Sequence, residues 1–261
     1  MRIGFIDSGV GGLSVYQQVQ QQVAADYIYL MDNKYLPYGE KSESFIQQRL
    51  YQLSEHLLDL GADLIVIACN TATTQAVEYL RQHFAIPFVG VVPAIKPAAA
   101  LSLGHGFAVL ATPATANGDY IAGLIRQFAP NDQVIKFGSS ELVRLAEDKV
   151  WYQQDVQQQV SDILSVSPLA EHHSHIVVLG CTHFPFLAEE IKCALPAATV
   201  LLETGDAIAR RVRQLVGEKL IYKKQYQHCF ISTRELNEVQ TNRLIQLGFD
   251  QHQCWPMPIA S

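Results

Sequence analysis

The sequence predicts an α/β protein made of two similar domains with mainly parallel sheets. Short apolar runs rich in β-branched residues alternate with longer stretches of mixed polarity, as in chains where each strand is followed by a helix. The runs are continuously apolar, which is typical of parallel strands that helices cover on both faces. In addition, one strand and the residues that follow it recur later in the chain, which suggests two related halves.

The expected strands follow the apolar runs in order along the chain: Ile3–Ile6, Tyr27–Met31, Leu64–Ala68, Phe88–Val92, Phe107–Leu110 and Ile176–Leu179. Helices are expected where the pattern becomes amphipathic, at Ser42–Leu60, Asp119–Phe128 and Gln154–Leu164. Towards the C-terminus the pattern predicts a helix over Ala207–Val216, a short strand over Cys229–Ser232 and a helix over Arg234–Leu247. That late strand is expected to return to the first sheet.

The internal repeat joins Ala62–Thr71 with Ser174–His183 and places Cys69 and Cys181 at equivalent positions. A weaker pair joins the strand before Asp7 with the strand before Thr112. Two halves facing one another in a pseudo-two-fold relation would explain both pairs, and coincidence of strand composition is the alternative. A Pro- and Ala-rich segment and a second break near residues 202–206 predict a first domain of residues 1–93 plus 206–261 and a second of residues 94–205.

The composition excludes several classes of protein. With 49% hydrophobic and 17% charged residues, the chain is expected to be compact rather than disordered or fibrous. The formal net charge is −6, and we interpret the densest basic groups, Arg210–Arg213 and Lys223–Lys224, as solvated faces rather than a nucleic-acid site. No apolar run approaches the roughly 18 residues that span a bilayer, and Asp7 interrupts the first run before a signal peptide could form. A cytoplasmic protein without membrane contact is therefore expected.

Polar residues follow four of the expected strands, where ligands bind in open parallel sheets. These segments are Asp7–Gly12, Cys69–Thr74, Thr112–Thr115 and Cys181–Pro185. Two of the four begin with a cysteine. A thiol at a strand end just before a helix lies near the positive end of the helix dipole, which favours the thiolate, a base or nucleophile.

The five cysteines include no CxxC pair, so reduced thiols are expected. Two thiols that approach from opposite sides suit a reaction in which one face of a carbon loses a proton and the other gains one, which is racemisation without a cofactor. A dithiol redox pair, a metal site that includes His183 and Asp7, and two simply buried cysteines are the alternatives. We interpret Cys193, Cys229 and Cys254 as packing or surface residues.

Two titratable residues stand beside these thiols in the sequence. His183 could exchange a proton with Cys181, and Asp7 could do so with Cys69. Structural roles are the alternatives: Asp7 as a helix cap and His183 as a partner of a backbone carbonyl. The loop Tyr35–Gly39 is either a cover over a pocket or an ordinary surface turn.

The known cofactor motifs are incomplete, so no cofactor and no metal are expected. The pattern G-x-G-x-x-G read from Gly9 requires glycine at position 14, where Ser14 stands, although Asp32 lies at about the spacing of a ribose ligand. The glycines are more consistent with backbone amides that approach a small anion. The loop lysines Lys34 and Lys96 have no phosphate cradle that would support pyridoxal chemistry.

Taken together, the motifs resemble glutamate racemases of the aspartate/glutamate racemase superfamily. The resemblance covers essentially the whole chain, and it is carried by Phe5–Ser14, Leu36–Gly39, Ala68–Ala72, Pro93–Pro97, Thr112–Thr115, Glu141–Glu147, Leu179–Pro185 and Phe230–Thr233. Cys-Asn-Thr recurs across the superfamily, whereas the opening loop together with Cys-Thr-His-Phe-Pro makes the narrower match specific.

The resemblance implies cofactor-independent interconversion of L- and D-glutamate for peptidoglycan, in a cleft between two α/β domains. Cys69 as thiolate would take the α-proton of D-glutamate while Cys181 as thiol protonates the opposite face, with roles reversed for L-glutamate. Asp7 would assist Cys69, His183 would assist Cys181, and Glu147 would support the site, although local sequence alone predicts an exposed helix residue there. The implied substrate-binding residues are Asp7, Ser8, Tyr38, Gly39, Asn70, Thr71, Thr112, Thr115, Thr182 and His183.

The resemblance also bears on partners and on specificity. It implies a homodimer, and a gyrase-inhibiting activity reported for some members is at most an addition, since no segment marks such a surface. No N-terminal extension precedes the first strand, so activation by a peptidoglycan precursor is not expected. Val92 stands where many members have an acidic residue. A racemase for aspartate or another small acid is the alternative within the superfamily.

Overall fold

The computed structural model describes residues 1–170, 175–217 and 225–256. The chain forms two compact units, which we call unit 1 (Met1–Val91 with Gly205–Ser261) and unit 2 (Val92–Thr204). Ser174 of the repeat and the basic pair Lys223–Lys224 lie outside the described residues.

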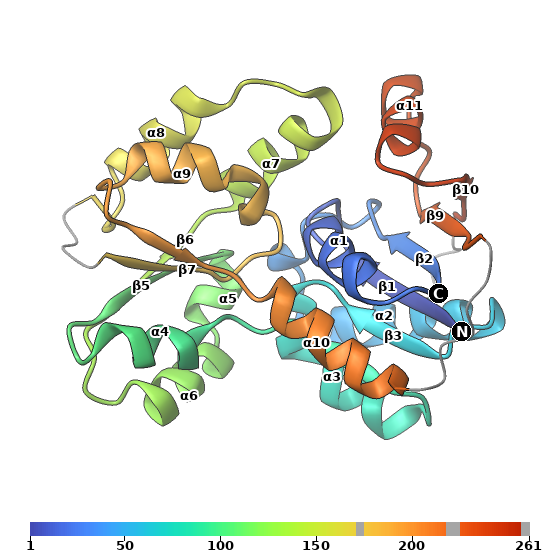
Figure 1. Ribbon diagram of the computed structural model, residues 1–261, viewed down its shortest axis with the longest axis horizontal. Helices are drawn as coiled ribbons and strands as arrows, with labels where there is room; N and C mark the ends of the chain where they lie inside the picture. The colour runs from blue at the N-terminus through green and yellow to red at the C-terminus, as the bar shows by residue number, and fades with distance from the viewer. Residues whose placement is uncertain (171–174, 218–224, 257–261) are drawn as a thin grey trace. The chain divides into compact units, whose positions relative to one another are not determined.

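Unit 1 contains one sheet of six parallel strands in the order β10-β9-β2-β1-β3-β4 (Figure 1). The strands are β1 (Arg2–Asp7), β2 (Asp26–Met31), β3 (Leu64–Ile67), β4 (Phe88–Gly90), β9 (His228–Ser232) and β10 (Gln251–Cys254). The late strand β9 returns to pair with β2, as predicted. The central strands are wholly buried, because helices cover both faces.

The helices of unit 1 lie on both faces of this sheet. Helices α1 (Leu13–Gln22) and α10 (Gly205–Val216) pack together on one face, and α2 (Glu43–Asp59) and α3 (Asn70–His83) on the other (Figure 1). Successive side chains of β2 alternate between these layers: Tyr27 and Tyr29 pack with Tyr16 of α1, whereas Ile28 and Leu30 join the apolar cluster beneath α2 and α3. A short 3-10 helix, η1 (Tyr38–Glu40), and α11 (Glu238–Gln246) complete the unit.

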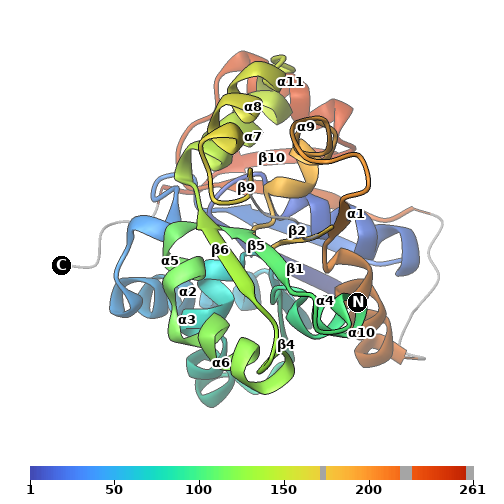
Figure 2. The same cartoon turned by 90° about the vertical axis from the view of Figure 1, so that its left-hand side faces the viewer.

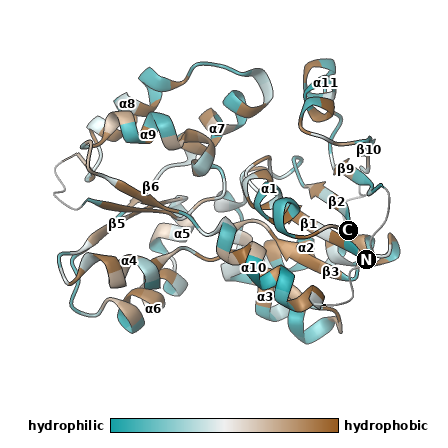
Figure 3. Cartoon of the chain, in the orientation of Figure 1, coloured by the Kyte–Doolittle hydropathy of each residue, from teal (hydrophilic) through white to brown (hydrophobic). Residues whose placement is uncertain are grey.

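Unit 2 contains four parallel strands in the order β6-β5-β7-β8. These are β5 (Phe107–Ala111), β6 (Val134–Gly138), β7 (Ile176–Leu179) and β8 (Val200–Leu202). One face carries α4 (Ile95–Ser102) and α6 (Asp119–Phe128), and the other α7 (Ser140–Tyr152), α8 (Gln157–Ser165) and α9 (Ala188–Ala194), with α5 (Pro113–Asn117) beside β6 (Figure 2). In Figure 3, strands β5 and β7 are coloured mainly as hydrophobic.

The four core strands have the same order in both units. In unit 1 the chain goes from β1 to β2 on one side and then to β3 and β4 on the other, and in unit 2 it goes from β5 to β6 and then to β7 and β8. The strand order therefore reverses once in each unit, between β1 and β3 and between β5 and β7. Open parallel sheets bind their ligands at such switch points, at the carboxyl ends of the strands.

The α/β class and the parallel sheets are confirmed. The apolar runs did not predict β6, β8 and β10, of which β10 is polar and half exposed. The helix ranges expected from the pattern also omitted α1, α3, α4, α7 and α9. The C-terminal helix begins at Glu238 instead of Arg234, because Asn237 and Gln240 form a reciprocal capping box at its start. Among the described residues, no helix combines the length and apolarity needed to cross a membrane.

Candidate active site

The predicted strand-end residues lie at the switch point of each unit. In unit 1, Asp7 is the last residue of β1, and Cys69 follows the neighbouring strand β3 after one intervening alanine. In unit 2, Thr112 follows β5 directly, and Cys181 follows β7 after one intervening glycine. Each unit thus presents one cysteine and one polar residue at the carboxyl edge of adjacent strands.

Cys69 is buried, with 7% of its surface exposed, and is the N-cap residue of α3. Its backbone is extended and its carbonyl accepts the first helical bond, from the Thr73 N–H at 2.9 Å. The first N–H groups of a helix carry its positive dipole end, so a negative charge on this thiol is favoured by position. This placement is the one that the sequence analysis predicted for the thiol.

Asp7 is fully buried and holds the glycine-rich loop that follows β1. One of its carboxylate oxygens accepts the Ser8 N–H at 2.6 Å, and the other accepts the Gly12 N–H. A Cβ at Gly12 would lie 2.7 Å from the Tyr29 hydroxyl and 2.8 Å from the Ala68 Cβ, so only glycine fits there. These carboxylate contacts hold the loop and do not cap α1, whose N-cap residue is Gly12 and which has no side-chain cap, so the capping alternative for Asp7 is wrong.

The first turn of α3 adds two polar residues beside Cys69. Asn70 and Thr71 are 4% and 2% exposed, respectively. Within the described part of the chain, the buried side-chain oxygen of Asn70 accepts no hydrogen bond. Since a buried polar atom without a partner costs about 1–3 kcal/mol, a ligand donor at this oxygen would be stabilising.

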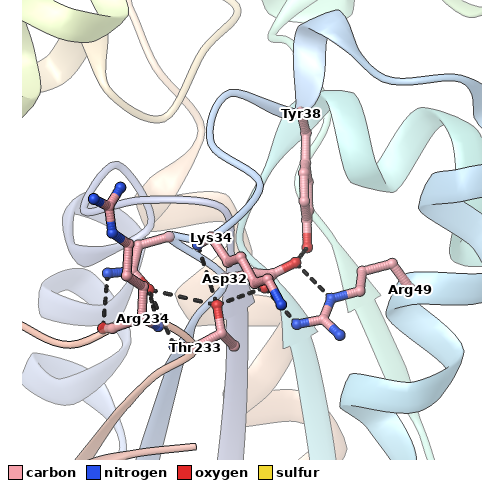
Figure 4. A network of polar contacts seen from close by, with 7 residues as sticks. Asp32, Lys34, Tyr38, Arg49, Thr233 and Arg234 are labelled. Carbon is pink, nitrogen blue, oxygen red and sulfur yellow. Dashed lines mark hydrogen bonds and ion pairs between the residues drawn. The ribbon is translucent and has the colours of Figure 1, made fainter. Parts of the chain in front are cut away.

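Tyr38 belongs to a buried polar network centred on Asp32 (Figure 4). The Asp32 carboxylate accepts the Tyr38 hydroxyl at 2.7 Å, the Thr233 hydroxyl at 2.7 Å and two nitrogens of Arg49 at 2.6 and 2.8 Å. Asp32 is 0% and Arg49 5% exposed, and the Asp32 N–H donates to the Asp7 carbonyl at 2.8 Å. The network therefore joins β2, η1, α2 and the end of β9 next to Asp7.

This network limits what its members can do. The Asp32 carboxylate already accepts four hydrogen bonds, so it has no acceptor site left for a ribose hydroxyl. Arg49 forms an ion pair with this carboxylate. Burial, and then the charge of Asp32, raise the pKa of Tyr38 well above its usual range, so its hydroxyl stays a donor. Tyr38 is thus anchored, and the half-buried Gly39 follows it. The surface-turn interpretation of this loop does not hold at Tyr38.

Replacing Arg49 with methionine should lower the free energy of unfolding by about 3–5 kcal/mol, because the buried Asp32 carboxylate would lose its counter-charge. Urea denaturation measures the change. The matched control is Arg81→Met in the same unit, where Arg81 pairs with the exposed Glu78 and the loss should stay within about 1 kcal/mol. Equal losses for the two variants would contradict the account of the buried pair.

In unit 2, a chain of three side chains leads from Cys181 into α7. The Cys181 Sγ lies 3.7 Å from the His183 Nδ1, and the His183 Nε2 lies 2.7 Å from the Glu147 Oε1. Cys181 and His183 are 6% and 3% exposed, and Glu147 is 9% exposed. Sequence alone suggested an exposed Glu147, which is wrong. The signal was present, because Val143 and Trp151, one turn to each side, place Glu147 on the buried face of α7.

The charge of His183 follows from these neighbours. Burial alone would lower its pKa, but hydrogen bonds and electrostatic interactions with Cys181 and Glu147 outweigh burial and raise the pKa of His183 well above 6.5. The imidazolium form is therefore favoured at neutral pH. An imidazolium whose Nδ1 faces a sulfur stabilises a thiolate there.

The two thiols differ in the helix that follows them. Cys181 is not a helix N-cap: the next helical residues form a 3-10 turn, η2 (Phe184–Leu187), which begins three residues later. The sequence expectation of a helix directly after each thiol is therefore right for Cys69 and wrong for Cys181. His183 supplies at Cys181 the positive charge that the dipole of α3 supplies at Cys69.

The remaining predicted site residues of unit 2 are buried threonines. The Thr112 hydroxyl caps α5, since it accepts the Thr115 N–H at 3.3 Å and donates to the Thr115 hydroxyl at 3.0 Å. Thr182, between Cys181 and His183, is 4% exposed. Cys193 is exposed and Cys229 and Cys254 are half-buried in β9 and β10, as a packing or surface role requires. In the described ranges, no three His, Cys, Asp or Glu side chains gather as a metal site.

The fold and the site define a two-unit α/β protein with a buried cysteine at the switch point of each sheet. The family model for Asp/Glu/hydantoin racemases matches residues 3–212, and the chain belongs to this family. Among similar proteins are the glutamate racemases of Shewanella frigidimarina, 44% identical over 93% of both chains, and of Pectobacterium carotovorum, 47% identical over 96% of this chain and 90% of the relative.

Solved structures agree with this assignment. Escherichia coli glutamate racemase in complex with L-glutamate and the activator UDP-MurNAc-ala superposes with a TM-score of 0.89, at 38% identity over 97% of both chains. Francisella tularensis glutamate racemase in complex with D-glutamate superposes with a TM-score of 0.80, at 26% identity over 97% of both chains.

Proposed function

We propose that the protein interconverts L- and D-glutamate without an organic cofactor, with Cys69 and Cys181 as the two bases, and supplies D-glutamate for peptidoglycan. The observation that carries this proposal is the equivalent placement of the two cysteines at the switch points of two sheets with the same core strand order. Each thiol has its own source of positive charge, the dipole of α3 for Cys69 and His183 for Cys181.

The proposed reaction moves one proton on each side of the α-carbon. With D-glutamate, the Cys69 thiolate takes the α-proton and becomes a thiol, while the Cys181 thiol gives its proton to the opposite face and becomes a thiolate. With L-glutamate the two cysteines exchange roles. His183 stabilises the thiolate form of Cys181, and Glu147 holds His183 in its charged form.

We propose that hydroxyls, amides and backbone N–H groups bind the substrate. The unpartnered side-chain oxygen of Asn70 is a suitable acceptor for the α-ammonium group. Arg49 is paired with Asp32, so we do not assign it to a substrate carboxylate. The carboxylates are instead suited to the hydroxyls of Ser8, Thr71 and Thr182 and to backbone amides near Gly39. Fixed dipoles of this kind stabilise the negative charge that develops when the α-proton leaves.

The test follows the circular dichroism of the purified protein with L-glutamate, D-glutamate or L-aspartate, without added pyridoxal phosphate, metal or nucleotide. We expect the signal of both glutamate enantiomers to decay to zero and that of L-aspartate to persist. Decay with aspartate alone would move the substrate to the shorter acid. No decay with any of them would refute the proposed activity.

A further inference from the structure

A hydrogen bond inside α7 aims the Glu147 carboxylate. The Trp151 indole N–H donates to the Glu147 Oε2 at 2.9 Å, while the other oxygen of the same carboxylate lies 2.7 Å from the His183 Nε2. Trp151 is 4% exposed, so water does not compete freely for this bond. The two oxygens thus bind different partners: Oε2 accepts from the helix itself, and Oε1 contacts the residue that contacts Cys181.

The indole is suited to this task by its chemistry. An indole nitrogen is a donor only and does not titrate, so it cannot exchange roles with the carboxylate. A hydrogen bond from a neutral donor to a charged acceptor is stronger than a hydrogen bond between two neutral groups. Holding Oε2 fixes the rotation of the carboxylate and with it the direction from which Oε1 meets the imidazole.

We propose that Trp151 is a positioning residue for the Cys181 half of the reaction, acting through Glu147 and His183. This inference rests on the proposed racemase activity and adds a residue to its machinery. It predicts that loss of the indole N–H weakens proton transfer at Cys181 and leaves proton transfer at Cys69 intact.

A one-sided defect has a distinctive kinetic signature. Enantiomers have equal free energies in water, so kcat/KM must fall equally for L- and D-glutamate in any variant. The isotope effect is not bound by this symmetry. Cys181 takes the α-proton of L-glutamate, so if proton transfer at Cys181 becomes rate-limiting, breaking the α-C–²H bond limits the reaction of L-glutamate. Cys69 takes the α-proton of D-glutamate, so the reaction of D-glutamate is not limited by breaking this bond.

The experiment measures kcat/KM and the primary deuterium isotope effect with each 2-²H-glutamate enantiomer for Trp151→Phe. We expect kcat/KM to fall about tenfold in both directions, with a larger isotope effect for L-glutamate only. The matched control is Trp255→Phe, since the Trp255 ring stacks on His56 in unit 1 and its removal should change neither quantity.

The competing explanation for a fall in kcat/KM is the cavity that the smaller phenylalanine ring leaves. A double-mutant cycle distinguishes this cavity effect from the loss of the hydrogen bond to Glu147. In a Glu147→Gln background, Trp151→Phe should cause little further loss, because the carboxylate it positions is already gone. A symmetric rise of the isotope effects, or an equal further loss in that background, would overturn the inference. If the unmodified protein does not racemise glutamate, the proposed function fails instead, so the two failures are distinguishable.

Discussion

Replacing either Cys69 or Cys181 with serine should lower kcat/KM for glutamate racemisation by about 10³-fold or more, within the range known for loss of a positioned acid or base. A hydroxyl is nearly the size of a thiol but remains protonated at neutral pH, so the variant lacks the base on one face of the α-carbon. The circular dichroism assay with either enantiomer measures the loss.

The control is the same replacement at Cys193 and Cys229, which lie on α9 and in β9 away from the switch points. Both controls should retain the activity of the unmodified protein. Unfolding in urea should be nearly unchanged for the two active-site variants. Near-normal rates in either variant would exclude the two-thiol mechanism.

Replacing His183 with asparagine should lower kcat/KM by about 10²-fold or more, because Cys181 loses the charge that stabilises its thiolate. Glu147→Gln should have a smaller effect with a diagnostic pH dependence. Removing the carboxylate lowers the pKa of His183, since Glu147 is one of the groups that raise it. The imidazole then loses its proton at lower pH.

The measurement is the pH profile of kcat/KM across the alkaline limb. For Glu147→Gln, the limb should move to lower pH. The raised pKa of His183 also makes the stability of the protein depend on pH. The protonated imidazole stabilises the folded protein fully below about pH 6.5, the pKa in the unfolded chain, and this stabilisation is lost as the pH rises through the higher pKa of the folded protein. A profile that superposes on that of the unmodified protein would contradict the role of Glu147.

The strand ends could be predicted from sequence because buried parallel strands leave long apolar runs. Leu64–Ile67 and Ile176–Leu179 are runs of this kind, and the residues just beyond them must emerge at one edge of a sheet. That argument places Cys69 and Cys181 without any tertiary information. Strand β10, with the polar sequence Gln-His-Gln-Cys, has no such signal, because pairing with β9 at the sheet edge needs no buried side chains.

The supporting residues could not be predicted in the same way, because tertiary packing makes them. Arg49 lies on the apolar face of α2 between Ile46 and Leu53, and only the fold shows that Asp32 meets it there. Glu147 and Trp151 follow the same rule on α7. The sequence shows that a polar residue lies on an otherwise apolar helical face, but it does not show which residue that side chain contacts. The site roles and the homodimer stay predictions.

During synthesis on the ribosome, the two units are completed at different times, because unit 2 is inserted into the sequence of unit 1. Unit 2 is one continuous segment, Val92–Thr204, whereas unit 1 needs the later residues of β9 and α10 to finish its sheet and its helical cover. Strand β9 ends 28 residues after unit 2, so at roughly 5–20 residues per second it is complete about 1–6 s later. Until then β2 is an unpaired edge, and Asp32 lacks the hydroxyl of Thr233. The inserted unit is therefore free to fold first, and the unit that begins the chain is the last to close.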